Sequence, residues 1–267
     1  MHSIVREIEA FNKKNMKDVF AMYKLPGETP LEALGRVRNR FKEIECEKLS
    51  YAGRLDPLAQ GVMVVLAGEA NKMREEYLNY DKSYYFDVLF GVKSDSLDPL
   101  GMVEKGVDPS DDLMRFIGNI SSEWRGEREM KYPAFSSKTV EGVPLFQYAR
   151  EGRDVTLPKR IINIYELEIV DVLQVPVPLL TGMAKKKVAM VRGDFRQPAV
   201  LESWSKLERS FAKGSTLPMV RFQIRSSSGT YVRSLVGQMG DEFGSYALAF
   251  HIVRTSVDSF GFRDLVF

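Results

Sequence analysis

The sequence is poor in the residues that hold metals and disulfides. Cys46 is the only cysteine among the 267 residues, so an intrachain disulfide and a cysteine-rich zinc site are both excluded. His2 and His251 are the only histidines, which argues against a metal site built from several imidazoles. We therefore expect no bound metal.

Long apolar runs and a strong charge of one sign are also missing. No apolar stretch approaches transmembrane length, and the first twenty residues lack the apolar core of a signal peptide. We expect a cytoplasmic protein without a membrane partner. The formal net charge of +2 is too small to indicate nucleic-acid binding by itself, although basic residues can still gather on one face. The length suits one large domain or two small ones.

The most informative stretch is residues 50–72. Asp56 stands between two glycines and is followed by Pro57, whose ring fixes the backbone φ angle. The apolar run at 62–67 predicts a buried strand. One interpretation is a stiff loop that presents a carboxylate at the mouth of a sheet. The alternative is an ordinary turn in which the aspartate caps its own backbone.

Periodicity outlines the remaining elements. Further strands are expected at 19–23, 81–91, 161–170 and 220–224. Helices are expected at 3–17, from Thr29 onward, at 72–78, at 111–120 after Ser110, and at 203–211. A basic run, Lys185 to Lys187, is interpreted as a solvated loop, with RNA contact as the alternative.

The segment Gly-Arg-Leu-Asp-Pro-Leu-Ala-Gln-Gly-Val around Asp56 resembles the active-site motif of the TruB family of pseudouridine synthases. Other motifs resemble that family in the same order, around Lys24, Tyr84, Phe135 and Arg233. The resemblance implies an α+β pseudouridine synthase fold: a mixed, largely antiparallel central sheet flanked by helices, with the active site in a central cleft.

The resemblance also implies residue roles. Asp56 would act as nucleophile or proton acceptor at the sugar, Arg233 would keep it charged and aimed, and Tyr84 would stack on the base and is a candidate proton acceptor. The expected substrate-binding residues are Tyr51, Tyr231, Ile252, Lys24, Arg54, Lys138, Arg150 and Arg254. Asp98 looks like an arginine partner or a turn former.

The domain organisation expected from the resemblance is simple. Residues 1–17 would form an N-terminal helical extension, and residues 18–267 would form the catalytic domain. Residues 174–217 do not match the family motifs and are interpreted as an insertion. The chain ends too soon after the last motif to hold the C-terminal RNA-binding PUA domain that many family members carry.

The function implied is isomerisation of the TΨC-loop uridine of tRNA (U55) to pseudouridine, by a monomer that needs no cofactor. The target base would be flipped out, its C–N bond cleaved and C5 joined to C1′. The sequence departs from the family at Tyr51, where members carry histidine, and at Val253, where they carry arginine. Two alternatives stay open: an RNA-binding protein or tRNA-folding chaperone that has lost catalysis, and a synthase for another RNA.

Overall fold

The structure is a computed structural model that describes residues 18–40, 48–109 and 112–266. The helical extension expected over residues 1–17 lies outside the described residues, as does Ser110, the expected start of the helix at 111–120.

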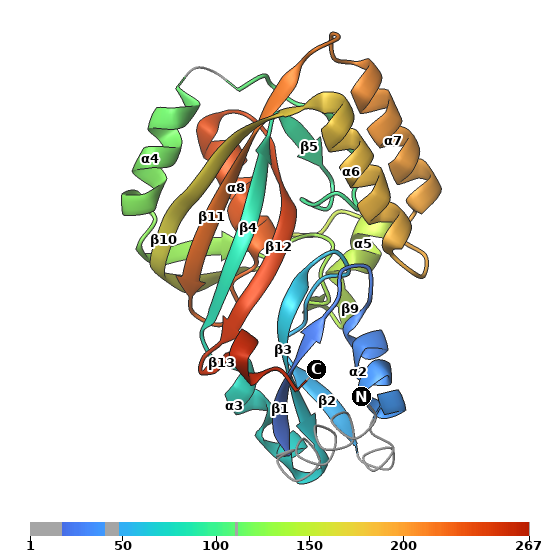
Figure 1. The fold of residues 1–267 in the computed structure, drawn as a ribbon, viewed down its shortest axis with the longest axis vertical. Coiled ribbons are helices and arrows are strands. Elements are labelled where there is room, and N and C mark those ends of the chain that lie inside the picture. Colours follow the sequence, from blue (N-terminus) through green and yellow to red (C-terminus); the bar gives the residue numbers. More distant parts are fainter. Residues whose placement is uncertain (1–17, 41–47, 110–111, 267) are drawn as a thin grey trace, which may run out of the picture.

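A nine-stranded sheet forms the centre of the molecule (Figure 1). The strands follow the order β1-β3-β12-β4-β11-β10-β7, with β2 paired to β3 and β13 paired to β12. Their bounds are β1 Val19–Lys24, β2 Leu49–Ala52, β3 Gln60–Ala67, β4 Lys82–Phe90, β7 Gly126–Lys131, β10 Lys159–Pro176, β11 Thr216–Ser226, β12 Ala247–Val257 and β13 Phe260–Gly261. The contact of β3 with β12 is parallel, and the other pairs in this sheet are antiparallel.

Two small hairpins and a set of helices complete the described chain. The hairpin strands are β5 Val92–Ser94, β6 Val103–Lys105, β8 Thr139–Val140 and β9 Val143–Pro144. The α-helices are α2 Pro30–Arg40, α3 Arg74–Leu78, α4 Leu113–Glu123, α5 Leu145–Glu151, α6 Val177–Met190, α7 Gln197–Arg209 and α8 Val232–Phe243. Two short 3₁₀ helices are η2 Gly68–Met73, which precedes α3, and η3 Phe262–Asp264, which follows β13.

Helices cover both faces of the sheet. Because side chains alternate along a strand, Phe86 and Val88 of β4 point to the face covered by α4 and α8. Leu89, on the other face of the same strand, belongs to the core formed with α6 and α7. In Figure 1, α4 lies at the left beside β10, α8 lies behind the central strands, and α6 and α7 stand together at the right. The expected α+β fold, with a largely antiparallel sheet flanked by helices, is confirmed.

Local sequence explains why several of these elements form. The apolar run predicted as a strand becomes β3, which is buried along nearly its whole length because both of its faces are packed. Met63 and Val65 belong to a core with α2, and Val62 and Val64 belong to a core on the other face. At the start of α2, the Thr29 hydroxyl accepts from the Glu32 amide (3.3 Å), and the Glu32 carboxylate accepts from the Thr29 amide (2.7 Å). This reciprocal capping box fixes where the helix begins, as predicted.

The segment interpreted as an insertion differs from expectation in detail. Strand β10 continues to Pro176 before the chain leaves the sheet, and two helices follow it. The basic run at Lys185 to Lys187 lies on α6 and not in a solvated loop, which corrects that interpretation. Lys187 packs over the ring of Phe250 (5.4 Å), and burial lowers its pKa. The neighbouring helix, α7, begins at Gln197, earlier than the predicted 203–211.

Candidate active site

The loop that carries Asp56 connects β2 to β3 and is held from beneath by two buried cations. Lys24, at the end of β1, donates from Nζ to the carbonyl oxygens of Pro57 (3.2 Å) and Ala59 (2.6 Å). Arg254 of β12 donates to the carbonyl oxygen of Gly53 (3.1 Å). Gly53 has a φ of +85°, which residues with a Cβ rarely adopt. The backbone on both sides of the carboxylate is therefore fixed.

Lys24 lies deeper than the other expected site residues. Its side chain is fully buried and does not line the cavity described below. Burial lowers the pKa of Lys24 to about 8, although Glu28 and Asp56 partly oppose the shift. The structure therefore places Lys24 under the loop, where its ammonium group supports the backbone around Asp56. Arg254 reaches the cavity wall, but its guanidinium is buried and donates to backbone oxygens.

Asp56 forms a two-point ion pair with Arg233, the second residue of α8. Nε donates to Oδ2 and Nη2 donates to Oδ1, both at 2.8 Å. The arginine side chain is 3% exposed, whereas the aspartate side chain is 29% exposed and faces the cavity. Arg233 thus supports the carboxylate from the protein side and leaves it open to a substrate.

Further groups fix the guanidinium of Arg233. It donates to the carbonyl oxygens of Ser96 (2.8 Å) and Phe135 (3.1 Å), and Asp98 lies 3.7 Å from its Nε. Burial disfavours the charge, but the two aspartates outweigh it and raise the pKa of Arg233. The arginine therefore stays cationic. Asp98 also accepts from the Ser96 hydroxyl and the Leu100 amide, so it both forms the turn and faces the arginine, as expected.

Tyr84 lies on β4, opposite Arg254 of β12, and its side chain reaches the cavity. Burial raises the pKa of Tyr84, and the nearby Arg254 only partly opposes this. The phenol is therefore protonated at neutral pH. Its neighbour Tyr85 points to the other face of the sheet and does not line the cavity. Of these two adjacent tyrosines, only Tyr84 can therefore reach a ligand in the cavity.

The cavity around Asp56 has a volume of about 830 Å³. It brings together every predicted site residue except Lys24: Asp56, Tyr84, Arg233, Tyr51, Tyr231, Ile252, Arg54, Lys138, Arg150 and Arg254. The Arg54 guanidinium donates to the Tyr51 hydroxyl (3.3 Å), so the residue in the family's histidine position lies at the wall of the site. The ring of Tyr231 packs edge-on against Tyr132 (5.3 Å), which also lines the cavity.

The cavity lining is strongly basic, although the whole chain is nearly neutral. Nine cationic side chains and two carboxylates line it. The cations are Arg54, Arg74, Lys82, Lys138, Arg150, Arg160, Arg196, Arg233 and Arg254. Four of these cations, Arg74, Lys82, Arg160 and Arg196, were not among the site residues expected from the sequence. Arg196 lies in the interpreted insertion, where no family motif points to it.

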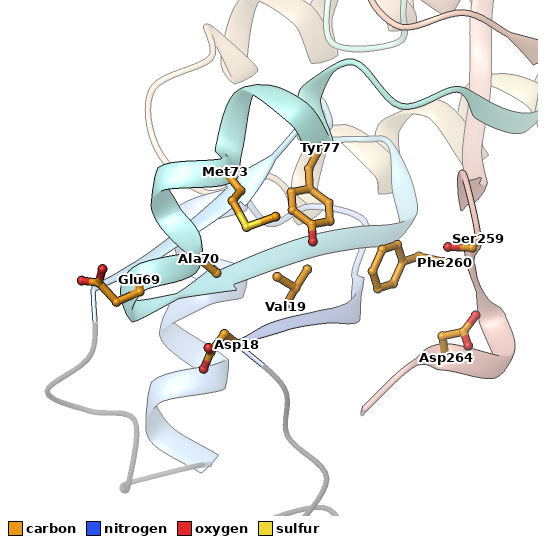
Figure 2. A pocket seen from close by; sticks show the side chains of 9 residues that line it. All are labelled: Asp18, Val19, Glu69, Ala70, Met73, Tyr77, Ser259, Phe260 and Asp264. Atoms are coloured by element: carbon orange, nitrogen blue, oxygen red, sulfur yellow. The ribbon is translucent and has the colours of Figure 1, made fainter.

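A second cavity, of about 680 Å³, has the opposite character. Val19, Tyr77 and Phe260 lie at its middle, and the carboxylates of Asp18 and Glu69 lie toward its edge (Figure 2). Its lining contains no cationic side chain among the described residues. The basic cavity around Asp56 is therefore the one suited to an anionic polymer.

Among the residues that the structure describes, no candidate metal centre accompanies these cavities. Within residues 18–40, 48–109 and 112–266, no group of three or more His, Cys, Asp or Glu side chains is placed to hold a metal ion. In the same part of the chain, no helix is both long and apolar enough to span a membrane.

Comparison with known proteins agrees with the resemblance seen in the motifs. The model of the "TruB family pseudouridylate synthase (N terminal domain)" matches residues 40–189. The chain belongs to the TruB family. The match extends into the segment interpreted as an insertion, up to the last turn of α6.

Curated relatives carry the name tRNA pseudouridine synthase B. One from Caldanaerobacter subterraneus subsp. tengcongensis is 34% identical over 153 residues, covering 57% of this chain and 52% of the relative. One from Lactobacillus johnsonii is 30% identical over 256 residues, covering 94% of this chain and 72% of the relative. The chain thus matches about half the length of the first of these TruB relatives.

Solved structures support the fold. A chain from a crystal structure of a Cbf5-Nop10-Gar1 complex aligns with 96% of this chain and 52% of its own length. The TM-score is 0.55 and the identity is 19%, so this likeness concerns the fold alone. A chain from an H/ACA RNP bound to a substrate RNA containing 2′-deoxyuridine aligns with 91% of this chain and 48% of its own length, at a TM-score of 0.51 and 18% identity.

Proposed function

We propose that the chain is an RNA pseudouridine synthase that isomerises the TΨC-loop uridine (U55) of tRNA. The observation that carries the proposal is the Asp56–Arg233 pair: a carboxylate held at two points by a buried arginine and open to a basic cavity. The two-point contact fixes the direction of the carboxylate, so that its exposed side is presented to a bound nucleotide.

The reaction needs no net gain or loss of electrons. The C1′–N1 bond breaks, the uracil turns, a C1′–C5 bond forms, the C5 proton leaves and N1 takes up a proton. We assign to Asp56 the role of nucleophile or proton acceptor at the sugar. Because a phenolate is scarce when burial raises the pKa of Tyr84, we assign this residue first to stacking on the base, with its hydroxyl as a donor.

The other cavity residues fit a single-stranded nucleotide drawn out of its loop. Tyr84, Tyr231 and Ile252 offer apolar surfaces to the base, and each stacked base recovers roughly 1–3 kcal/mol. Arg54, Lys138 and Arg150 offer charge to the backbone phosphates. The names of the bacterial relatives support tRNA as the RNA.

We further propose a monomer acting in the cytoplasm, without a cofactor. Both members of the central ion pair come from one chain, which supports a site formed within a monomer.

Pseudouridine mapping on an unmodified tRNA transcript tests the proposal. Wild type and Asp56→Asn are compared by carbodiimide adduct formation and primer extension. We expect a stop at the T-loop uridine with wild type only. The asparagine variant keeps the size of the side chain but removes its charge. Binding of tRNA without a stop in either sample would favour the chaperone, and a stop elsewhere would favour another target uridine.

A further inference from the structure

The connector between α6 and α7 brings the interpreted insertion into the active site. Of the described residues in 174–217, Phe195 and Arg196 line the cavity that holds Asp56. The two helices themselves pack on the opposite face of the sheet from α8. The connector is therefore the part of this segment that can meet a substrate.

Arg196 is fixed in place by two contacts. Its Nη1 and Nη2 donate to the carboxylate of Asp95 at 2.8 and 3.2 Å. Its guanidinium lies over the ring of Phe135, 4.6 Å from the centroid. These contacts occupy one edge and one face of the planar group, while 31% of the side chain stays exposed. An arginine held in this way loses little side-chain entropy when it binds a further anion.

The backbone of the connector is equally well supported. Arg196 has a φ of +59°, a conformation that residues other than glycine adopt at a cost and that persists where the surroundings impose it. The Gln197 side chain accepts from the Phe195 amide (2.9 Å) and donates to the carbonyl oxygen of Gly193 (2.7 Å). Trp204 anchors α7 by donating to the carbonyl oxygen of Pro99 (2.9 Å).

We propose that Phe195 and Arg196 form an RNA subsite that grips the strand beside the flipped nucleotide. Arg196 binds a backbone phosphate, because its fork of donors matches phosphate oxygens. Phe195 offers a ring on which a neighbouring base stacks. Arg150 also lines the cavity and donates to the carbonyl oxygen of Asp194, the residue before Phe195, so a second cation lies beside this RNA subsite. The inference rests on the proposed function.

A purely structural role for Arg196 makes a different prediction. Asp95 belongs to the turn whose Ser96 carbonyl oxygen accepts from Arg233, and the carbonyl oxygen of Phe135 accepts from the same arginine. If Arg196 served only to hold these two elements, removing its partner Asp95 would have the same effect as removing Arg196 itself.

The test measures binding of a T-arm hairpin RNA to the full chain by fluorescence anisotropy over a range of salt concentrations. The variants are Arg196→Ala, Asp95→Asn and Phe195→Ala. The matched control is Arg209→Ala, which removes an exposed arginine of α7 that pairs with Glu202 away from the cavity. Circular dichroism and thermal unfolding check that each variant folds.

For Arg196→Ala we expect the dissociation constant to rise about tenfold, and the slope of log K against log salt to fall in magnitude by about 0.7, the value for one phosphate contact on a single strand. Asp95→Asn should keep the wild-type slope. Phe195→Ala should weaken binding about fivefold or more without changing the slope, because stacking involves no counterion release. Arg209→Ala should match wild type.

An unchanged slope in Arg196→Ala would overturn the proposal, as would the same loss of affinity and slope in Asp95→Asn. The outcome is separate from that of the proposed function. A wild-type protein that forms no pseudouridine would refute the synthase, yet its salt slope would still report whether Arg196 contacts a phosphate.

Discussion

Replacing Arg233 by lysine tests whether the fork of the guanidinium, and not its charge alone, positions Asp56. The arginine makes four hydrogen bonds, two to the Asp56 carboxylate and two to the carbonyl oxygens of Ser96 and Phe135. A lysine ammonium carries its donors on one atom and cannot reach these four acceptors together. The charge is kept while the two-point contact is broken.

The hydrogen bonds that a lysine cannot make set the expected magnitude. Hydrogen bonds to charged groups contribute roughly 1.5–3 kcal/mol each; a lysine has three donors, so at least one of the four bonds would be missing and the others would be weakened. Asp56 is 29% exposed and regains some hydration, so we expect the free energy of unfolding to fall by about 2–4 kcal/mol. A misplaced carboxylate should also lower turnover by roughly 100-fold, as a displacement of about 1 Å does in other enzymes.

Arg221→Lys is the matched control. Arg221 also binds a carboxylate at two points, Asp87 at 2.7 and 3.0 Å, but its side chain is 44% exposed and does not line the cavity. We expect this variant to lose no more than about 1 kcal/mol and to keep full turnover. Stability is measured by urea unfolding and turnover by single-turnover pseudouridine formation. If both lysine variants behaved alike in both assays, the reasoning about the fork would be refuted.

Two further predictions concern the scaffold. A Cβ on Gly61, whose φ is +115°, would lie 2.1 Å from the carbonyl oxygen of Arg254, so Gly61→Ala should unfold the protein or lower the free energy of unfolding by more than about 3 kcal/mol. A Cβ on Gly35 in α2 meets nothing within 4 Å, so Gly35→Ala should raise the free energy of unfolding by up to about 1 kcal/mol. Thermal melts compare the two variants, and equal melting temperatures would contradict this prediction. Burial lowers the pKa of Lys24 to about 8 in the folded state, so between about pH 8 and 9.5 the unfolded chain binds more protons than the folded one, and the free energy of unfolding rises with pH. Urea unfolding of Lys24→Met should therefore show a shallower rise of this free energy with pH than wild type. The same pH dependence in both proteins would contradict the prediction.

Much of the fold was predictable because its signals are local. The continuous apolar run of β3 is typical of a strand that is buried on both faces. The alternation of apolar and polar residues along β11 is typical of a strand whose two faces differ. The capping box at Thr29 and Glu32 marks the start of α2 within four residues of sequence. The Lys185 to Lys187 run was wrongly interpreted, because a polar stretch is equally compatible with a solvated loop and with a helix that buries one lysine against an aromatic ring.

Some features of the candidate site were likewise predictable from local sequence, and others were not. Residue types alone predicted a tight loop around Asp56, since Pro57 fixes its own φ angle and Gly53 tolerates a positive φ, and the family motif then singled out the aspartate. The pairing of Asp56 with Arg233, 177 residues away, was expected from the family resemblance, but only the folded chain shows its two-point geometry. The folded chain also places Lys24 beneath the loop and not in the cavity. It alone brought Arg196 to the wall of the site. Such long-range contacts depend on how the strands order in the sheet, and no local pattern encodes that order.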